Sequence, residues 1–136
     1  MPTDYYQVLG VPRDASADEL YAAALPRVQA LAAEGVATIE IKSGYGLAID
    51  SELKLLSVAR QLGQATPVTV RTTLLAAHTV PPEYLGRADE YIDLICDELL
   101  PEVAAGGLAD AVDAYCESIA FSASQVAKLF SRAAEL

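Results

Sequence analysis

Tyr45 and His78 are the residues whose types and positions are best suited to chemistry. Tyr45 lies in the segment SGYGL, which directly follows a β-branched run, and His78, the only histidine, closes a second such run. A phenol can donate a hydrogen bond to a carboxylate or carbonyl, and an imidazole near neutral pH can donate, accept or transfer a proton. Together the two side chains suit a small polar or anionic ligand, which the backbone at Gly44 and Gly46 could approach closely.

Each of these side chains also has a structural interpretation. A lone histidine at a strand end is more often a satisfied structural residue than a catalytic one, and Tyr45 could simply cover the rim of the fold. The SGYG segment lacks both glycine-rich phosphate-binding signatures. Glu40 and Lys42 share one strand face, where they could line a polar barrel interior or pair at an exposed sheet edge.

The sequence predicts no metal site. A single histidine excludes a centre built from several imidazoles, and Cys96 and Cys116 do not have zinc-ligand spacing with His78. Neither cysteine has a recognisable activating partner nearby in the sequence. Both are therefore expected to be buried, unreactive thiols.

The composition is typical of one ordered domain. The chain has 136 residues, of which 53% are hydrophobic and 21% charged, whereas disordered segments combine low hydrophobicity with high charge. A net charge of −10 argues against nucleic-acid binding, because neutralising phosphates needs clustered lysine and arginine. No apolar run is long enough to span a membrane, and the first ten residues lack the features of a secretory signal. With two cysteines, we expect a reduced, cytoplasmic environment.

Alternating helix and strand signals position the two candidate residues. Ser16 with Glu19, and Ser122 with Gln125, form capping-box patterns that mark helix starts, and Asp50 is predicted to cap another helix. The predicted helices cover 16–35, 50–63, 88–100 with a short continuation from Pro101, and the residues from 122 onward; the predicted strands cover 36–42, 67–77 and 109–116.

This alternation predicts the fold class. Strands that alternate with helices favour right-handed βαβ units and a parallel sheet. We therefore expect an α/β fold, a partial (β/α) barrel with about three parallel strands and flanking helices, because a closed barrel needs roughly 250 residues. Ligands in such folds bind at the carboxyl ends of the strands, so Tyr45 and His78 should lie on the same rim.

Three stretches carry a resemblance to a known enzyme family: LAAEGVATIEIKSGYGL at 31–47, RTTLLAAHTVPPEYLGRADEYIDLICDELLP at 71–101 and GLADAVDAYCESIAFS at 107–122. From about residue 19 to 136 the chain resembles a middle segment of the imidazolonepropionases, a cyclic amidohydrolase family. The resemblance implies a barrel enzyme that hydrolyses 4-imidazolone-5-propanoate to N-formimidoyl-L-glutamate in histidine degradation. It also matches Tyr45 and His78 to substrate-binding positions of that family.

The family's metal ligands do not carry over to this chain. The family uses zinc or iron, but its paired histidines would precede the matching segment, and its later histidine, acid–base glutamate and metal-binding aspartate would follow it. A bound metal lowers the pKa of water to around 7 and so supplies the hydroxide for hydrolysis. We therefore expect no cofactor, no catalytic residue and little or no turnover from this chain alone.

The beginning of the chain has a different resemblance. Residues 4–20, DYYQVLGVPRDASADEL, resemble the start of a J-domain, a co-chaperone module, although the His-Pro-Asp tripeptide of that family does not occur. We accordingly divide the sequence into a J-domain-like segment over 1–18 and an imidazolonepropionase-like segment over 19–136. Two alternatives stay open: a non-catalytic α/β scaffold that forms a homo-oligomer through open sheet edges, and a chaperone-interaction module.

Overall fold

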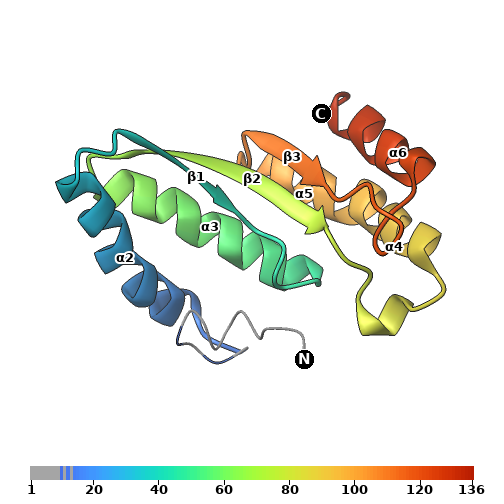
Figure 1. The fold of residues 1–136 in the computed structure, drawn as a ribbon, viewed down its shortest axis with the longest axis horizontal. Helices are drawn as coiled ribbons and strands as arrows, with labels where there is room; N and C mark the ends of the chain where they lie inside the picture. The colour runs from blue at the N-terminus through green and yellow to red at the C-terminus, as the bar shows by residue number, and fades with distance from the viewer. Residues whose placement is uncertain (1–9, 11, 13) are drawn as a thin grey trace.

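The computed structural model describes residues 10, 12 and 14–136, which form an α/β fold (Figure 1). Helices and strands alternate in the predicted order. The helices are α2 (Ala17–Ala33), α3 (Ile49–Ala65), α4 (Ala88–Leu94), α5 (Leu100–Ala105) and α6 (Ala123–Ala133); the strands are β1 (Thr38–Lys42), β2 (Thr69–Ala77) and β3 (Ala111–Ala114); the shorter turns are η1 (Pro82–Tyr84) and η2 (Ile95–Leu99). Most of the predicted J-domain-like segment over 1–18 lies outside the described residues, so that assignment stays a prediction.

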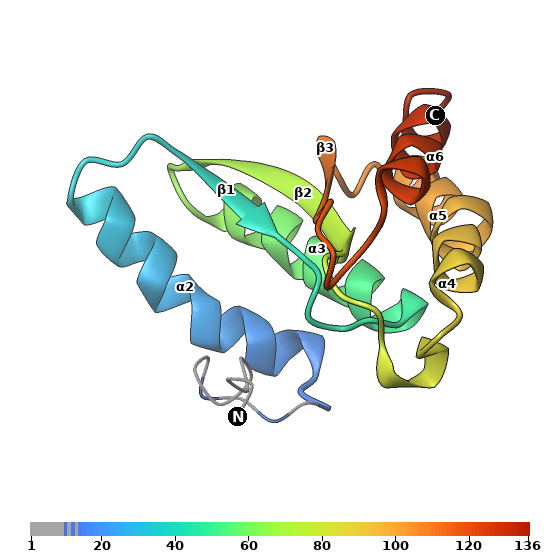
Figure 2. The ribbon, with the colours of Figure 1, turned by 45° about the vertical axis from the view of Figure 1, so that its right-hand side comes forward.

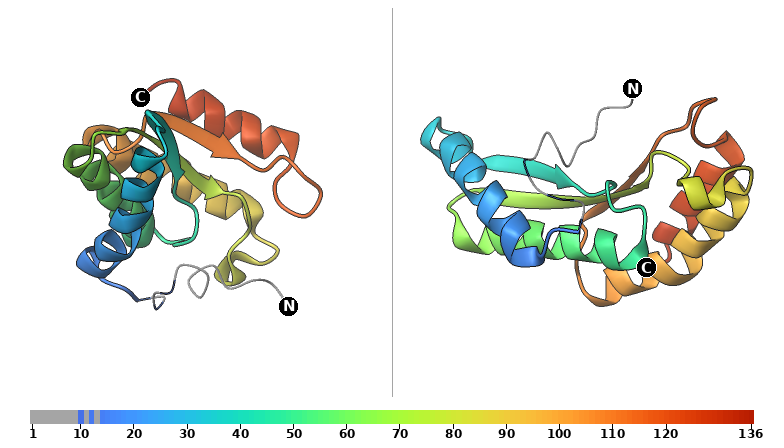
Figure 3. Two further views of the ribbon diagram at one scale, coloured as in Figure 1. Left: turned by 60° about the vertical axis from the view of Figure 1, so that its left-hand side comes forward. Right: turned by 90° about the horizontal axis from the view of Figure 1, so that it is seen from below.

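The three strands form one parallel sheet in the order β1-β2-β3. Thr38 of β1 lies opposite Thr69 of β2, and Thr73 of β2 lies opposite Ala111 of β3. Helices α3 and α5 lie along one side of this sheet, and α2 packs beside α3, as the views in Figures 2 and 3 show. The prediction of three parallel strands with flanking helices is therefore confirmed, as an open sheet within the described residues.

The side chains of strand β1 alternate between an apolar and a polar face of the sheet. Its residues alternate in burial, with Ile39 and Ile41 packed against the helices and Glu40 and Lys42 exposed. This period of two places every second side chain on the opposite face of a strand. The helices cover the apolar face, and the side chains of Glu40 and Lys42 lie on the other.

Two groups of apolar side chains hold the elements together. The larger group joins β2 to the continuous helical segment α4-η2-α5 and to α6, with Leu74, Ile92 and Leu129 almost completely buried. The smaller group joins α2 to α3, through residues such as Val28 and Leu62. Because these groups fix α3 and β2 relative to each other, they also fix the loops that follow β1 and β2.

The ends of helix α3 differ from the prediction. Its N-cap is Ala48 rather than Asp50, which lies inside the first turn. The helix also continues past Gly63 to Ala65, and the hydroxyl of Thr66 donates to the carbonyl of Leu62 at 2.8 Å. Gly63 serves packing instead of ending the helix, because a β-carbon there would lie only 3.0 Å from the β-carbon of Val70.

The segment around Pro101 forms one helix with a π turn in it. The prediction of a separate short helical piece is only half right, because α4, η2 and α5 follow one another without a break. Within η2 the chain bonds at a wider spacing, so that the N–H of Leu100 donates to the carbonyl of Ile95. Pro101 follows directly after this π turn, as the second residue of α5, and has no N–H to donate within the continuous helical segment.

Candidate ligand site at the strand ends

Tyr45 and His78 meet at the carboxyl ends of the first two strands. Tyr45 lies in the loop after β1, and His78 directly follows β2. The centroids of their rings are 5.9 Å apart and the ring planes are inclined at 63°, an edge-to-face contact. Tyr45 is 38% exposed, so its ring remains accessible from solvent. The sequence prediction that both side chains share one rim agrees with this placement.

The imidazole of His78 is oriented by the backbone of its own strand. Its Nδ1 lies 3.1 Å from the carbonyl oxygen of Leu75. A carbonyl oxygen only accepts hydrogen bonds, so this contact requires the proton on Nδ1. In the neutral ring Nε2 is then the acceptor, which fixes the tautomer that His78 presents.

Tyr115 is a third aromatic residue of the rim that the sequence analysis missed. It follows β3, and its ring lies 5.9 Å from that of His78 with the planes at 79°. It is 46% exposed. The rule that identified Tyr45 and His78, a polar side chain just past a strand end, does not find Tyr115 from the sequence, because the predicted strand over 109–116 includes it, whereas β3 ends at Ala114.

Glu52 is the second residue that the sequence analysis missed. It lies in the first turn of α3 and is completely buried, at 0% exposure. Its carboxylate accepts backbone N–H bonds from Gly44 at 2.7 Å, Gly46 at 2.8 Å and Leu47 at 2.9 Å. Glu52 therefore connects the rigid start of α3 to the loop that carries Tyr45.

The two glycines beside Tyr45 are needed for contacts within the protein. Gly44 has a φ of +116°, and a β-carbon there would lie 2.6 Å from the carbonyl oxygen of Leu75. At Gly46 a β-carbon would lie 2.4 Å from that of Ser51. The structure shows that both glycines let the loop pack against β2 and α3; their role in admitting a ligand stays a prediction.

Charged side chains form a row across the polar face of the sheet. The ammonium of Lys42 lies 2.7 Å from the carboxylate of Asp113 and 3.8 Å from that of Glu40, which also accepts the hydroxyl of Thr73 at 2.6 Å. The hydrogen bond with Asp113 raises the pKa of Lys42, and the same bond lowers the pKa of Asp113. Of the two alternatives for Glu40 and Lys42, the structure supports pairing at an exposed sheet edge, because the two lie 3.8 Å apart on β1.

The cysteines differ from each other in environment. Cys96 is buried, and burial raises the pKa of its thiol. Cys116 is exposed, which corrects the expectation that both thiols would be buried; it lies two residues after the end of β3. Within the described residues, no group of three or more histidine, cysteine, aspartate or glutamate side chains is placed to hold a metal ion. None of the helices described is long and apolar enough to cross a membrane.

Most of the chain is similar to proteins of one name, the imidazolonepropionases, although no protein-family model matches it. The chain is 61% identical over 121 residues to the imidazolonepropionase of Ectopseudomonas mendocina, an alignment that covers 89% of this chain and 30% of that protein. It is 63% identical over 121 residues to the imidazolonepropionase of Pseudomonas entomophila and 59% identical over 121 residues to that of Serratia proteamaculans, with the same coverage in each case. Over about nine tenths of its length this chain is thus similar to imidazolonepropionases, and it spans about 30% of the length of the relatives it matches.

Proposed function

We propose that Tyr45 and His78 form part of a binding rim for a ligand that joins a nitrogen-containing ring to a carboxylate, of the imidazolone-propanoate class. The observation that carries the proposal is the contact between their two rings at neighbouring strand ends, 5.9 Å apart. The names of the relatives support the ligand class, because all three are imidazolonepropionases. Parallel α/β folds bind their ligands at this end of the strands.

The chemistry of the two side chains fits complementary parts of such a ligand. The phenol of Tyr45 can donate to a carboxylate or to a ring carbonyl oxygen. With its proton held on Nδ1 by Leu75, the neutral His78 can accept a ring N–H at Nε2. A donor and an acceptor side by side would fix both the position and the orientation of the ring.

The proposal concerns binding and not turnover. The resemblance implies zinc or iron, but the described residues do not supply a fitting set of donors, because His78 is one imidazole and its Nδ1 is bonded to a carbonyl. We therefore derive no hydrolytic step through a metal. We also infer a reducing, cytoplasmic setting, which the two unbridged cysteines favour.

The test is a calorimetric titration with imidazole-4-propanoate, a stable compound with the same ring size and carboxylate. Tyr45→Phe removes only the hydroxyl, and His78→Ala removes the imidazole. Each change is expected to weaken binding about fivefold, which corresponds to the roughly 1 kcal/mol that one net hydrogen bond contributes. Tyr21→Phe on α2, within the smaller apolar group, is the matched control and should leave affinity unchanged. Unchanged affinity in both rim variants would show that the rim is assigned wrongly.

A second candidate function, self-association, is favoured by the open edges of the sheet. Within the described residues β1 and β3 each pair with β2 alone. Their lengths match closely, at five and four residues, and both run in the same direction, so β1 of a second copy can continue the sheet beyond β3. Exposed edges of this kind are templates for pairing with another chain.

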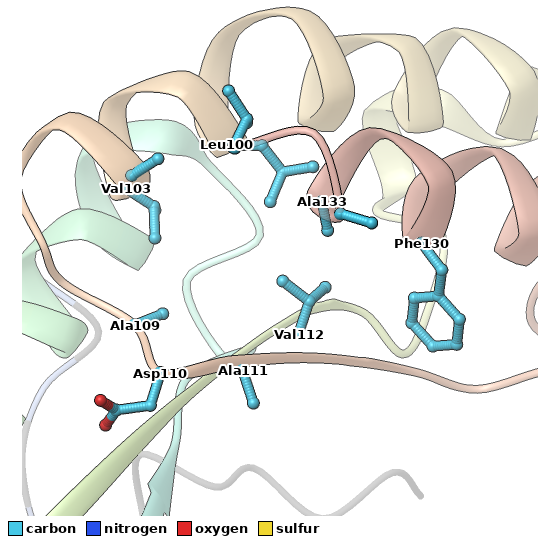
Figure 4. Close-up of a pocket in the computed structure, with 11 residues that line it drawn as sticks. Leu100, Val103, Ala109, Asp110, Ala111, Val112, Phe130 and Ala133 are labelled. Carbon is cyan, nitrogen blue, oxygen red and sulfur yellow. The ribbon is translucent and has the colours of Figure 1, made fainter.

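A groove beside β3 supports this second candidate. It has a volume of about 500 Å³ and lies between α5, β3 and α6, with Leu100, Val103, Val112 and Phe130 among its lining residues (Figure 4). A second copy whose β1 edge extends the sheet would bring its own helices over this groove. The net charge of −10 repels another copy, so added salt should strengthen the association.

Sedimentation velocity at micromolar concentration tests self-association. The wild-type chain is expected to form species larger than a monomer, and Phe130→Glu, which places a charge in the groove, should reduce them. Ile119→Glu is the matched control, because Ile119 is 86% exposed and does not line the groove. A wild-type chain that sediments as a monomer at both low and high salt would contradict this candidate.

A further inference from the structure

We propose that Glu52 is the positioning residue of the ligand rim: its buried carboxylate holds the loop on both sides of Tyr45 and so fixes the Tyr45 ring against His78. This inference rests on the rim being the binding site, as proposed above. Glu52 itself is completely buried and has no path to a ligand on the rim. It acts through the backbone alone.

The hydrogen bonds of Glu52 enclose Tyr45 in the sequence. Oε2 accepts from the N–H of Gly44, the residue before Tyr45, and Oε1 accepts from Gly46 and Leu47, the two residues after it. Hydrogen bonds to a charged acceptor are about twice as strong as those between neutral groups. With both flanks held by one rigid group, the backbone at Tyr45 has little freedom to turn its ring away from His78.

The backbone of the loop is shaped to reach this carboxylate. Gly44 has a φ of +116° and Leu47 a φ of +54°, so the chain passes through left-handed conformations on both flanks of Tyr45. Such conformations are costly for a residue with a side chain, as at Leu47, unless surrounding contacts maintain them. The bond from the Leu47 N–H to Glu52 is one such contact.

Helix α3 provides the rigid base that positioning requires. Glu52 lies in its first turn, where the exposed N–H groups of a helix start favour a negative charge. One turn later Leu56 is completely buried in the larger apolar group. A buried carboxylate is tolerated only when hydrogen bonds replace its lost hydration, and the three N–H bonds do so.

The experiment compares Glu52→Gln with Asp50→Asn in the same chain. Both variants replace a carboxylate by an amide in the same helical turn, but Asp50 is exposed. In Glu52→Gln one ligating oxygen becomes an NH₂ group, which cannot accept the N–H bonds. Three quantities are measured: hydrogen exchange at the amides of Gly44, Gly46 and Leu47, nuclear Overhauser contacts between the Tyr45 and His78 rings, and affinity for imidazole-4-propanoate.

In the wild-type chain the three loop amides should exchange at least tenfold more slowly than that of Gly86, an exposed loop glycine. Glu52→Gln should accelerate their exchange, remove the contacts between the rings and weaken binding about tenfold, which corresponds to about 1.4 kcal/mol. Asp50→Asn should change none of the three. The circular dichroism spectrum of each variant verifies that it is folded.

The outcomes separate this inference from the function it rests on. Suppose that the wild-type chain does not bind imidazole-4-propanoate but Glu52→Gln loses the contacts between the rings. That result would refute the binding proposal and retain the positioning role. Ring contacts and affinity that persist in Glu52→Gln would refute the positioning role. If that variant fails to fold, exchange in the wild-type chain decides, because loop amides as fast as Gly86 would overturn the inference.

Discussion

Replacing Gly44 by alanine should destabilise the protein by more than any change at an ordinary loop glycine. A φ of +116° costs a residue with a β-carbon about 1–3 kcal/mol. The new β-carbon would also lie 2.6 Å from the Leu75 carbonyl oxygen and 3.2 Å from Nδ1 of His78. The first of these is a backbone atom that cannot rotate away, so the loop must shift, at a further cost of about 1–3 kcal/mol. We expect a total loss of about 2–6 kcal/mol, a large share of the roughly 5–15 kcal/mol that stabilises a typical domain.

Gly86→Ala provides the control for the cost of backbone conformation. Gly86 also has a positive φ, of +77°, but a β-carbon there meets no atom within 4 Å. Gly86→Ala should therefore lower the free energy of unfolding by only about 1–2 kcal/mol. Urea unfolding followed by circular dichroism gives both values, provided that the denaturant dependence is the same in the two variants. If the two losses agree within about 0.5 kcal/mol, the close approach of the loop to β2 contributes nothing and our account of Gly44 is refuted.

Three further changes follow from contacts elsewhere in the fold. The pKa of Asp110 is lowered, chiefly by a backbone N–H bond from Thr72, so its stabilisation is present above its unfolded pKa of about 4 and is lost as the pH falls through the folded value. Asp110→Asn should therefore reduce the free energy of unfolding by about 1–3 kcal/mol at neutral pH, with a difference from wild type that shrinks in acid, measured by urea unfolding at several pH values. Ser122→Ala removes the capping box of α6 and should cost about 1 kcal/mol in the same assay. A thiol reagent should modify the exposed Cys116 rapidly and the buried Cys96 only upon unfolding, as mass spectrometry of the labelled chain would show.

For each of these three predictions, one outcome would contradict the reasoning. If the difference in free energy of unfolding between wild type and Asp110→Asn stays constant from neutral to acid pH, the charge of Asp110 does not stabilise the fold. Ser131→Ala, an exposed change inside α6, serves as the comparison for Ser122, and equal losses would exclude a specific capping effect. Equal labelling rates for the two cysteines in the folded chain would contradict the burial of Cys96.

The order of elements and the rim could be predicted because their signals are local. Capping boxes at Ser16 and Ser122 mark helix starts within four residues, and both form as predicted. The alternation of strands and helices then places Tyr45 and His78 at the same end of a parallel sheet, where the structure finds them. These inferences need the handedness of βαβ units and no long-range contact.

Glu52 could not be predicted in the same way, because its environment is created by tertiary structure. A glutamate in the first turn of a helix is usually solvated, and Asp50, two residues earlier, has the same local pattern yet is exposed. Only the return of the loop over the start of α3 buries Glu52 and aims three N–H groups at it. The exposure of Cys116 depends likewise on where the chain turns after β3.

The π turn η2 has a consequence for the direction in which the long helical segment faces. One row of its buried residues recurs at every fourth position: Tyr91, Ile95, Leu99 and Val103. In a regular α-helix a spacing of four advances the side chain by about 40° each time, so three steps would wind this stripe about a third of the way around the axis. The wider π turn rotates the chain less per residue and resets the helical phase midway. Residues before and after η2 can therefore face the same side, even though their period in the sequence is not that of an α-helix.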